Sequence, residues 1–292
     1  MLPDDRKSRL IRSTAAAAAP TLVSRVLGYV RDLLQAYYLG TGTGADAFII
    51  AYTIPNLFRR LTGEGALAPA FVPTFAELRQ RGDRRALWAF GNAVFWDLAL
   101  IAAVAVGLGI LFAPGLVRVI AHGFGGVAGK WGLTVLMTRV MFPYLLFIAL
   151  AALASAVLNA CGRFFVPAST PILFNLVIIA AVTGWARDAR EPALVFAFAV
   201  VAGGVLQLAL QVPFAWKEGM RFTFGLSFRD PLVRRVGRLM VPGIFGSSVY
   251  LVNFAVSRMI AASLEEGSAS ALYYASRIEE LTLGLFSIAL AA

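Results

Sequence analysis

The chain has 292 residues, of which 59% are hydrophobic and 14% are charged, and its mean hydropathy is +0.77. Soluble domains carry about 25% charged residues, so this composition excludes an ordinary soluble domain and indicates a polytopic membrane protein. The formal net charge is +10. The basic residues nevertheless fall into short separate loops rather than one extended face, so we expect no nucleic-acid partner. The single cysteine, Cys161, excludes an intramolecular disulfide.

Apolar segments of about 20 residues, separated by turn residues or charges, predict about eight transmembrane helices and an all-α fold. The predicted spans are residues 13–39, 46–79, 86–111, 133–160, 164–185, 193–216, 236–264 and 270–292. Period-2 alternation is weak, which argues against an outer-membrane barrel. The apolar carboxyl end has no cap, loop or basic stop, so we expect the chain to end inside a helix.

Basic residues outside these spans are divided unequally between the two ends of the helices. One end receives Arg6, Lys7, Arg9, Arg12, Arg79, Arg81, Arg84, Arg85, Arg163, Lys217, Arg221, Arg229, Arg234, Arg235 and Arg238. The other end receives only Arg118, Lys130, Arg187 and Arg190. By the positive-inside rule the first end, which includes the amino terminus, is predicted to be cytoplasmic.

A short internal repeat divides the chain. A shift of 224 residues aligns residues 46–51 with 270–275, and each segment follows a short glycine-containing outer loop, at 40–44 and 265–267. This predicts two six-helix lobes of the same orientation, related by an axis along the membrane normal. Chance similarity between two apolar helices is the alternative. The predicted layout is a basic arm at 1–12, a first lobe at 13–216, a cytoplasmic linker at 217–235 and the start of a second lobe at 236–292.

The first span carries its polar residues on one side. On a helical wheel at about 100° per residue, Ser24, Arg25, Arg31 and Asp32 share one arc. An arginine at the centre of a transmembrane helix costs about 2.5–3.5 kcal/mol on insertion scales, so this arc must face a cavity or a partner helix. Arg25 and Asp32 are seven residues apart and can pair, which is the structural alternative. Arg31 is expected to have no such partner on its own helix.

The second span combines charges with helix-breaking residues. Its polar residues include Asp46, Asn56, Arg59, Arg60 and Glu64. Pro55 removes a backbone donor and Gly65 follows, so we predict a break between them. Broken helices beside intramembrane charges are typical of transporter sites. Snorkelling of Arg59 or Arg60, and pairing of either with Glu64, are the structural alternatives.

The last span adds Arg277, directly after the repeated segment, with Glu279 and Glu280 as alternative structural partners. Arg258 is expected to be an interfacial anchor. Arginines converging on one cavity would suit a diphosphate, because a guanidinium donates two parallel hydrogen bonds to phosphate oxygens and stays charged. The sequence contains no catalytic, metal-binding or cofactor-binding motif. We therefore expect a transporter rather than an enzyme, with no cofactor and no metal.

Several motifs occur in a fixed order along the chain. They are residues 24–32 (SRVLGYVRD), 45–48 (ADAF), 55–60 (PNLFRR), 64–66 (EGA), 70–73 (AFVP), 142–144 (FPY), 203–207 (GGVLQ) and 273–277 (YYASR). In this order and spacing they resemble the MurJ/MviN family of bacterial lipid II flippases. The similarity covers essentially the whole chain.

The resemblance implies a two-lobe helical transporter of the MATE/MOP-exporter type in the bacterial cytoplasmic (inner) membrane. Its substrate would be lipid II, the undecaprenyl-pyrophosphate-linked muropeptide, moved from the inner to the outer leaflet by alternating access. Membrane lipids and the peptidoglycan-synthesis machinery are the other implied partners. Arg25, Arg31, Arg59 and Arg277 would line a cationic cavity with Asp32 and Asp46, and the supporting residues would be Ser24, Asn56, Arg60 and Glu64.

The chain departs from the family pattern at Ser257, where many members carry an aspartate of a sodium site, so the resemblance does not extend to sodium coupling. Two alternatives remain open. One is a polysaccharide-lipid or drug exporter of the same superfamily. The other is an integral-membrane enzyme acting on lipid pyrophosphates, which should add an acid–base set; the single histidine, His122, in a predicted outer loop argues against it.

Overall fold

The computed structural model describes residues 4–59 and 66–291, and side chains are described except those of 4–19, 54, 58–59, 247, 249–250 and 281–291. The helices are α1 (Asp4–Leu39), α2 (Thr43–Arg59), α3 (Leu67–Gln80), α4 (Arg84–Ile120), α5 (Lys130–Met141), α6 (Tyr144–Ala160), α7 (Phe165–Trp185), α8 (Pro192–Glu218), α9 (Pro231–Ala262) and α10 (Ser268–Ala291), with a short 3₁₀ helix at His122–Gly126. The all-α prediction is confirmed.

Two predicted spans are each built from two helices. The second span includes α2 and α3. Pro55 lies inside α2, which continues to Arg59, and the rest of the stretch in which the break was predicted, residues 60–65, lies outside the described residues. The fourth span is divided between α5 and α6 at Phe142 and Pro143, a break that we did not predict. Pro143 has no backbone N–H, so the hydrogen-bond ladder is interrupted at this position.

Four segments of the described chain are long and apolar enough to cross a membrane: Arg84–Ile120, Lys130–Ala160, Phe165–Trp185 and Pro192–Glu218. The bent helix α9 would be a fifth. These segments support the polytopic prediction. The remaining predicted spans, α1, α2 with α3, and α10, are the ones that carry the candidate site residues.

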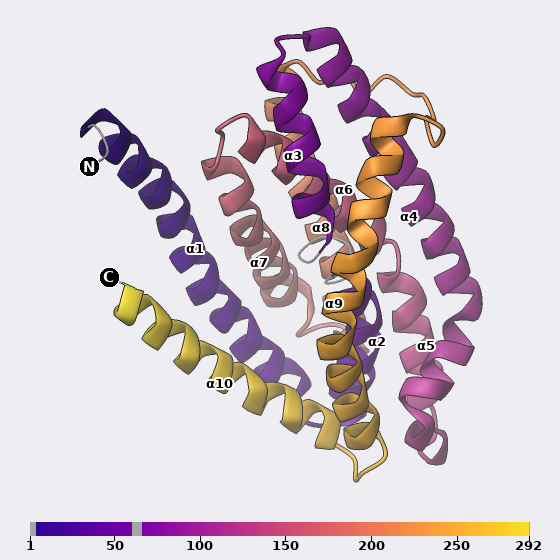
Figure 1. The fold of residues 1–292 in the computed structure, drawn as a ribbon. Helices are drawn as coiled ribbons and strands as arrows, with labels where there is room; N and C mark the ends of the chain where they lie inside the picture. The colour runs from indigo at the N-terminus through magenta and orange to yellow at the C-terminus, as the bar shows by residue number, and fades with distance from the viewer. Residues whose placement is uncertain (1–3, 60–65, 292) are drawn as a thin grey trace.

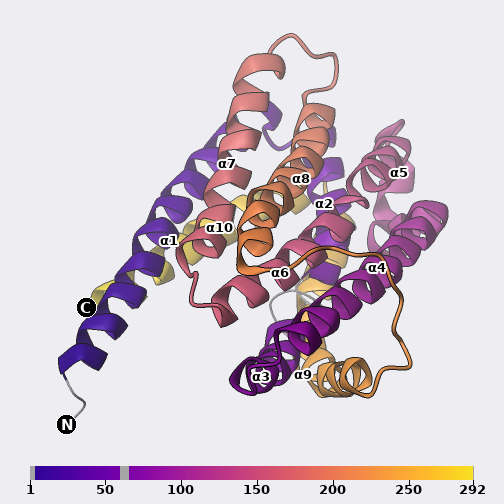
Figure 2. The same ribbon diagram turned by 90° about the horizontal axis from the view of Figure 1, so that it is seen from above.

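The helices form two groups around α6 and α8. Helix α1 packs along α7, and α7 packs on α8, while α3, α4 and α9 lie together on the other side (Figure 2). Helix α10 contacts α1, α2 and α9. The ribbons of α1 and α10 converge at the end where α10 begins and diverge toward the two termini (Figure 1).

Two adjacent glycines of α8 allow close packing of the helices that support α1. A Cβ atom on Gly203 would lie 2.6 Å from the ring of Phe174 on α7, and one on Gly204 would lie 2.6 Å from the ring of Tyr144 on α6. Small residues let transmembrane helices approach closely, which strengthens their dispersion contacts. Gly203 therefore lets α7 pack closely on α8, and from this position α7 contacts the charged residues of α1.

Candidate functional site

The first group of charged residues, here called the Asp32 cluster, consists of Arg31, Asp32, Asn175, Tyr273 and Arg277. Asp32 is 8% exposed, and its Oδ1 accepts hydrogen bonds from Arg31 Nη2 at 2.7 Å and Nε at 3.0 Å. From α10, Tyr273 OH donates to the same oxygen at 3.3 Å, and Arg277 Nε lies 3.5 Å from Oδ2. Asp32 thus joins α1 to α10.

The expectation that Arg31 lacks an acidic partner on its own helix is wrong. Neighbouring residues point about 100° apart on a helix, but the long arginine side chain bends back to reach Asp32. Arg31 Nη1 also donates to Asn175 Oδ1 at 3.1 Å, and Asn175 Nδ2 donates to the Ser24 carbonyl at 2.9 Å. Helix α7 therefore holds the guanidinium from the side opposite α10, and Ser24 supports it through its main chain.

Tyr273 places two further cations near Asp32. The guanidinium of Arg277 lies 5.1 Å from the centre of the Tyr273 ring, and that of Arg258 lies 5.5 Å from it. Both distances are within the range of cation–π attraction. Arg277 also pairs with Glu280, one of its predicted structural partners.

Arg258 is not an interfacial anchor. It is 3% exposed, packs 5.1 Å from the centre of the Phe254 ring, and donates to the Ala269 carbonyl at 3.2 Å. The aromatic faces and the carbonyl replace water around the guanidinium, which explains how it is buried. Counted over the described side chains, three arginines surround Asp32 and Glu280, so this region has an excess of positive charge.

The other predicted site residues lie apart from these contacts or are not described. Arg25 is exposed and lies on α1 two turns before Asp32. Asn56 is buried on α2, with an exposed fraction of 6%. The side chain of Arg59, and residues Arg60 and Glu64, lie outside the described residues. The structure brings Arg31 and Arg277 together, and the convergence of Arg25 and Arg59 with them stays a prediction.

Asp46 lies in a second group, here called the Asp46 tie, with Lys130, Gly267 and Ser270. Its Oδ2 accepts from Lys130 Nζ at 2.8 Å and from the Gly267 backbone N–H at 2.9 Å. Its Oδ1 accepts from the backbone N–H and the hydroxyl of Ser270, each at 2.8 Å. The carboxylate is 2% exposed and holds the first turn of α10. The structure thus places Asp46 in a tie between α2, α5 and α10, not in the Asp32 cluster.

Lys130 was expected to be an outer-loop residue. It is instead the first residue of α5 and is 2% exposed, because its ammonium pairs with Asp46 and lies 4.2 Å from the centre of the Phe124 ring. A buried lysine requires such a partner. Neither Lys130 nor Asn175 was identified as a site residue from the sequence. For Asn175 a signal existed in the sequence, since it is an amide side chain in the middle of a predominantly apolar predicted span.

The tie joins the two positions that the internal repeat aligns, Asp46 and Ser270. Equivalent positions meet where two copies face each other across a two-fold axis, and the relation between the lobes itself stays a prediction. Nearby, Thr43 pairs with Glu266, and Ser263 Oγ lies 3.1 Å from His122 Nε2. The predicted outer loops therefore lie at one end of the molecule.

Little open space lies beside Arg31 in this conformation. A cavity of only about 10 Å³ lies beside Arg31, lined also by Tyr52, Phe174 and Tyr273. Such a volume is close to the minimum needed for one water molecule. This cavity is too small for a diphosphate, so a diphosphate could enter the space beside Arg31 only if the surrounding helices moved apart.

Comparison with known proteins decides the family. A sequence profile of the family described as Lipid II flippase MurJ matches residues 35–292. The chain belongs to the MurJ family. It is 36% identical over 290 residues to a protein named "Probable lipid II flippase MurJ" from Vibrio cholerae, an alignment that covers 97% of this chain and 55% of that protein. The chain spans about half the length of the curated relatives it matches.

Solved structures agree with the family. The fold is similar to "Lipid II flippase MurJ, inward closed conformation", with a TM-score of 0.78, 27% identity, and coverage of 93% of this chain and 56% of that one. It also resembles a MOP superfamily transporter from Pyrococcus furiosus, with a TM-score of 0.61, 12% identity, and coverage of 92% of this chain and 60% of that one. The second likeness shows a shared fold, which confirms the predicted MOP-exporter architecture.

Proposed function

We propose that this chain forms the first lobe and the start of the second lobe of a flippase that exports lipid II from the inner to the outer leaflet of the bacterial cytoplasmic membrane. The observation that carries the proposal is the meeting of Arg31 and Arg277 at Asp32. Family membership supports it, since a relative that is 36% identical over 290 aligned residues is named "Probable lipid II flippase MurJ".

The Asp32 cluster suits the pyrophosphate of lipid II. Arg31 and Arg277 come from different helices and share one carboxylate, which keeps two guanidinium groups close together before substrate arrives. A diphosphate carries more negative charge than one carboxylate and accepts bidentate hydrogen bonds from both. It would therefore displace Asp32 as their partner when α10 separates from α1. No covalent step is involved, so the proposed role is transport and not catalysis.

The Asp46 tie supplies the gate that alternating access needs. It holds α10 against α2 and α5 at the predicted outer end, while α1 and α10 diverge toward the other end (Figure 1). Release of the tie would open the outer side. The membrane potential favours export of an anionic head group by about 2.3 kcal/mol per charge per 100 mV, and it draws an empty cationic site back inward.

The proposal includes a cytoplasmic amino terminus and outer loops at 40–44 and 265–267, with the basic arm at 1–12 and the linker at 217–235 in the cytoplasm. Cysteines placed singly in each loop of a Cys161→Ala protein, and labelled in intact cells, test this orientation. We expect both outer loops to react with a membrane-impermeant reagent. Labelling of both loops only after the cells are opened would contradict the proposed topology.

The function itself is tested by complementation of a flippase-depleted strain with the full-length protein. We expect Arg31→Ala and Arg277→Ala to abolish growth at normal membrane levels, and lysine at either position to restore it only in part, because an ammonium lacks the bidentate fork. Arg81→Ala, which removes an exposed arginine outside the spans, is the matched control. Full growth with both alanine variants would show that these arginines are structural and would contradict the proposed mechanism.

A further inference from the structure

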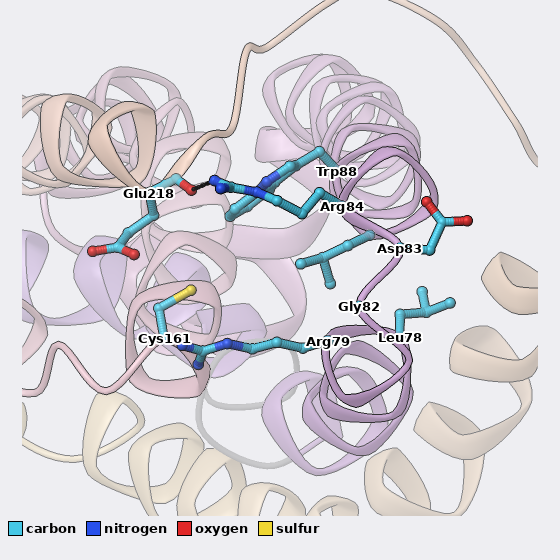
Figure 3. Close-up of a pocket in the computed structure, with 9 residues that line it drawn as sticks. Leu78, Arg79, Gly82, Asp83, Arg84, Trp88, Cys161 and Glu218 are labelled. Atoms are coloured by element: carbon cyan, nitrogen blue, oxygen red, sulfur yellow. Dashed lines mark hydrogen bonds between the residues drawn. The ribbon is translucent and has the colours of Figure 1, made fainter.

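A second basic site lies at the end of the molecule opposite the Asp46 tie. A cavity of about 280 Å³ opens between the corner that joins α3 to α4, the turn after α6, and the carboxyl end of α8 (Figure 3). Its lining includes Arg79, Arg84, Trp88, Cys161 and Glu218. None of these residues belongs to the Asp32 cluster or to the tie.

Two guanidinium groups frame this cavity. Figure 3 shows Arg79 and Arg84 extending from the α3–α4 corner along its two sides, with the Cys161 side chain between their ends. Arg79 donates to the Ala160 carbonyl at the end of α6, and Arg84 Nη2 lies 3.5 Å from the Glu218 carbonyl at the end of α8. A guanidinium has five N–H donors, so one carbonyl contact leaves each arginine with donors for a ligand.

The nearby carboxylates do not neutralise these arginines. Asp83 accepts from the Ala86 backbone N–H at 2.9 Å, and Glu218 Oε1 accepts from Arg163 Nε at 2.7 Å. In Figure 3 both carboxylates point away from the cavity. The pKa of Arg163 is raised, chiefly by its hydrogen bond to Glu218, so Glu218 already has a cationic partner other than Arg79 and Arg84.

The ends of α6 and α8 oppose an anion only weakly. Each helix carboxyl end carries about half a negative charge, and Arg79 and Arg84 already contact carbonyls of these two ends. Two full positive charges therefore dominate the cavity. Its volume is below the range of about 300–1,000 Å³ typical of pockets for drug-sized ligands, so it suits a small anionic group.

We propose that this cavity is a binding site for a phosphate group, held by Arg79 and Arg84. The group could belong to an anionic lipid head group or to a free phosphate compound, because both present the same oxygens to the guanidinium forks. When bound, it would connect the α3–α4 corner to the ends of α6 and α8. This inference does not depend on the transport proposal.

Cys161 provides the reporter for a test, because its side chain lies between the two arginines. The full-length protein, with any other cysteine replaced by alanine, is placed in phosphatidylcholine nanodiscs and labelled with a maleimide. Burial raises the pKa of the Cys161 thiol, so labelling is run at about pH 8.5 to provide enough thiolate. One arm adds inorganic pyrophosphate, with sodium chloride of equal ionic strength as its control. The other arm includes phosphatidylglycerol in the nanodiscs without added phosphate.

We expect labelling to slow by about tenfold when pyrophosphate is present at about ten times its Kd, or when phosphatidylglycerol fills the site. Protection in the pyrophosphate arm identifies a site open to soluble phosphates, and protection in the lipid arm alone identifies a head-group site. Arg79→Gln and Arg84→Gln should each abolish protection. Protection is the ratio of the Cys161 labelling rate without ligand to the rate with ligand, measured within each variant. Arg81→Gln and Arg85→Gln remove equal charge from the same corner and should retain it. No protection in either arm, or equal loss in both variant pairs, would overturn the proposal.

Discussion

Asp32 and Asp46 both reach the second lobe through α10, yet their surroundings differ. Asp46 accepts four hydrogen bonds from Lys130, Gly267 and Ser270, and its carboxylate is 2% exposed. Asp32 is shared by Arg31, Tyr273 and Arg277, and the Arg277 side chain is 27% exposed. In the tie, the Asp46 carboxylate and the Lys130 ammonium neutralise each other. The region around Asp32 instead contains more arginines than carboxylates.

Charged residues inside a helical bundle can stabilise the fold or bind a ligand. The number of opposite charges around each residue separates these two roles. In the tie, one carboxylate meets one ammonium and backbone donors, so no charge remains for a ligand. Around Asp32, three guanidinium groups from α1, α9 and α10 (Arg31, Arg258 and Arg277) outnumber the two carboxylates of Asp32 and Glu280. The tie should therefore control stability and gating, and the Asp32 cluster should control substrate capture.

The largest expected effect comes from Asp46→Ala. Removing one partner of a buried ion pair leaves the other charge uncompensated, so the free energy of unfolding should fall by about 3–5 kcal/mol. Thermal unfolding in detergent measures this loss. Adding Lys130→Met to Asp46→Ala removes the stranded ammonium and should recover part of the stability. An unchanged melting temperature for Asp46→Ala would show that the tie does not hold the helices.

A smaller loss is expected from Gly267→Ala. Gly267 has a φ of +91°, and a Cβ atom there would lie 2.4 Å from the Thr41 carbonyl oxygen. Left-handed strain and this backbone clash should together cost about 1–3 kcal/mol. Gly40→Ala is the matched control, because Gly40 has a φ of +60° and nothing within 4 Å of its Cβ position. Equal losses in the two variants would show that close approach of the outer loops is unimportant.

The smallest effect is expected from Tyr273→Phe, which removes the hydrogen bond to Asp32 but keeps the ring beside Arg258 and Arg277. The free energy of unfolding should fall by about 1 kcal/mol. Tyr273→Leu also removes the aromatic face, and it should cost about 1 kcal/mol more through lost cation–π attraction. Urea unfolding of the two variants measures both steps. If Phe and Leu were equally tolerated, the ring would not stabilise the arginines.

Much of the fold follows from the sequence because apolar length and turn residues specify helices directly. The repeat aligned Asp46 with Ser270, but the hydrogen bonds between them became visible only in the structure. The break at Pro143 was missed because the apolar pattern continues through it.

The candidate site was less predictable, because its contacts join residues far apart in the chain. The polar arc of α1 indicated Arg31 and Asp32, but pattern alone could not show that they pair with each other. Burial of Lys130 and Arg258 depends on Asp46, Phe124, Phe254 and Tyr273, which only the tertiary structure brings together. The sequence pattern therefore predicted that Lys130 and Arg258, near the ends of the spans, were exposed to water, whereas the structure buries both.

The most direct test measures lipid II affinity and melting temperature on the same preparations of full-length Arg277→Ala and Asp46→Ala proteins. Loss of a charge-assisted hydrogen bond costs about 1.5–3 kcal/mol, so Arg277→Ala should weaken lipid II binding by roughly 10–100-fold. The melting temperature should fall only modestly, because Asp32 keeps its pair with Arg31. Asp46→Ala should lower the melting temperature far more than Arg277→Ala does. Normal lipid II binding by a well-folded Arg277→Ala protein would contradict the assignment of the Asp32 cluster as the diphosphate site.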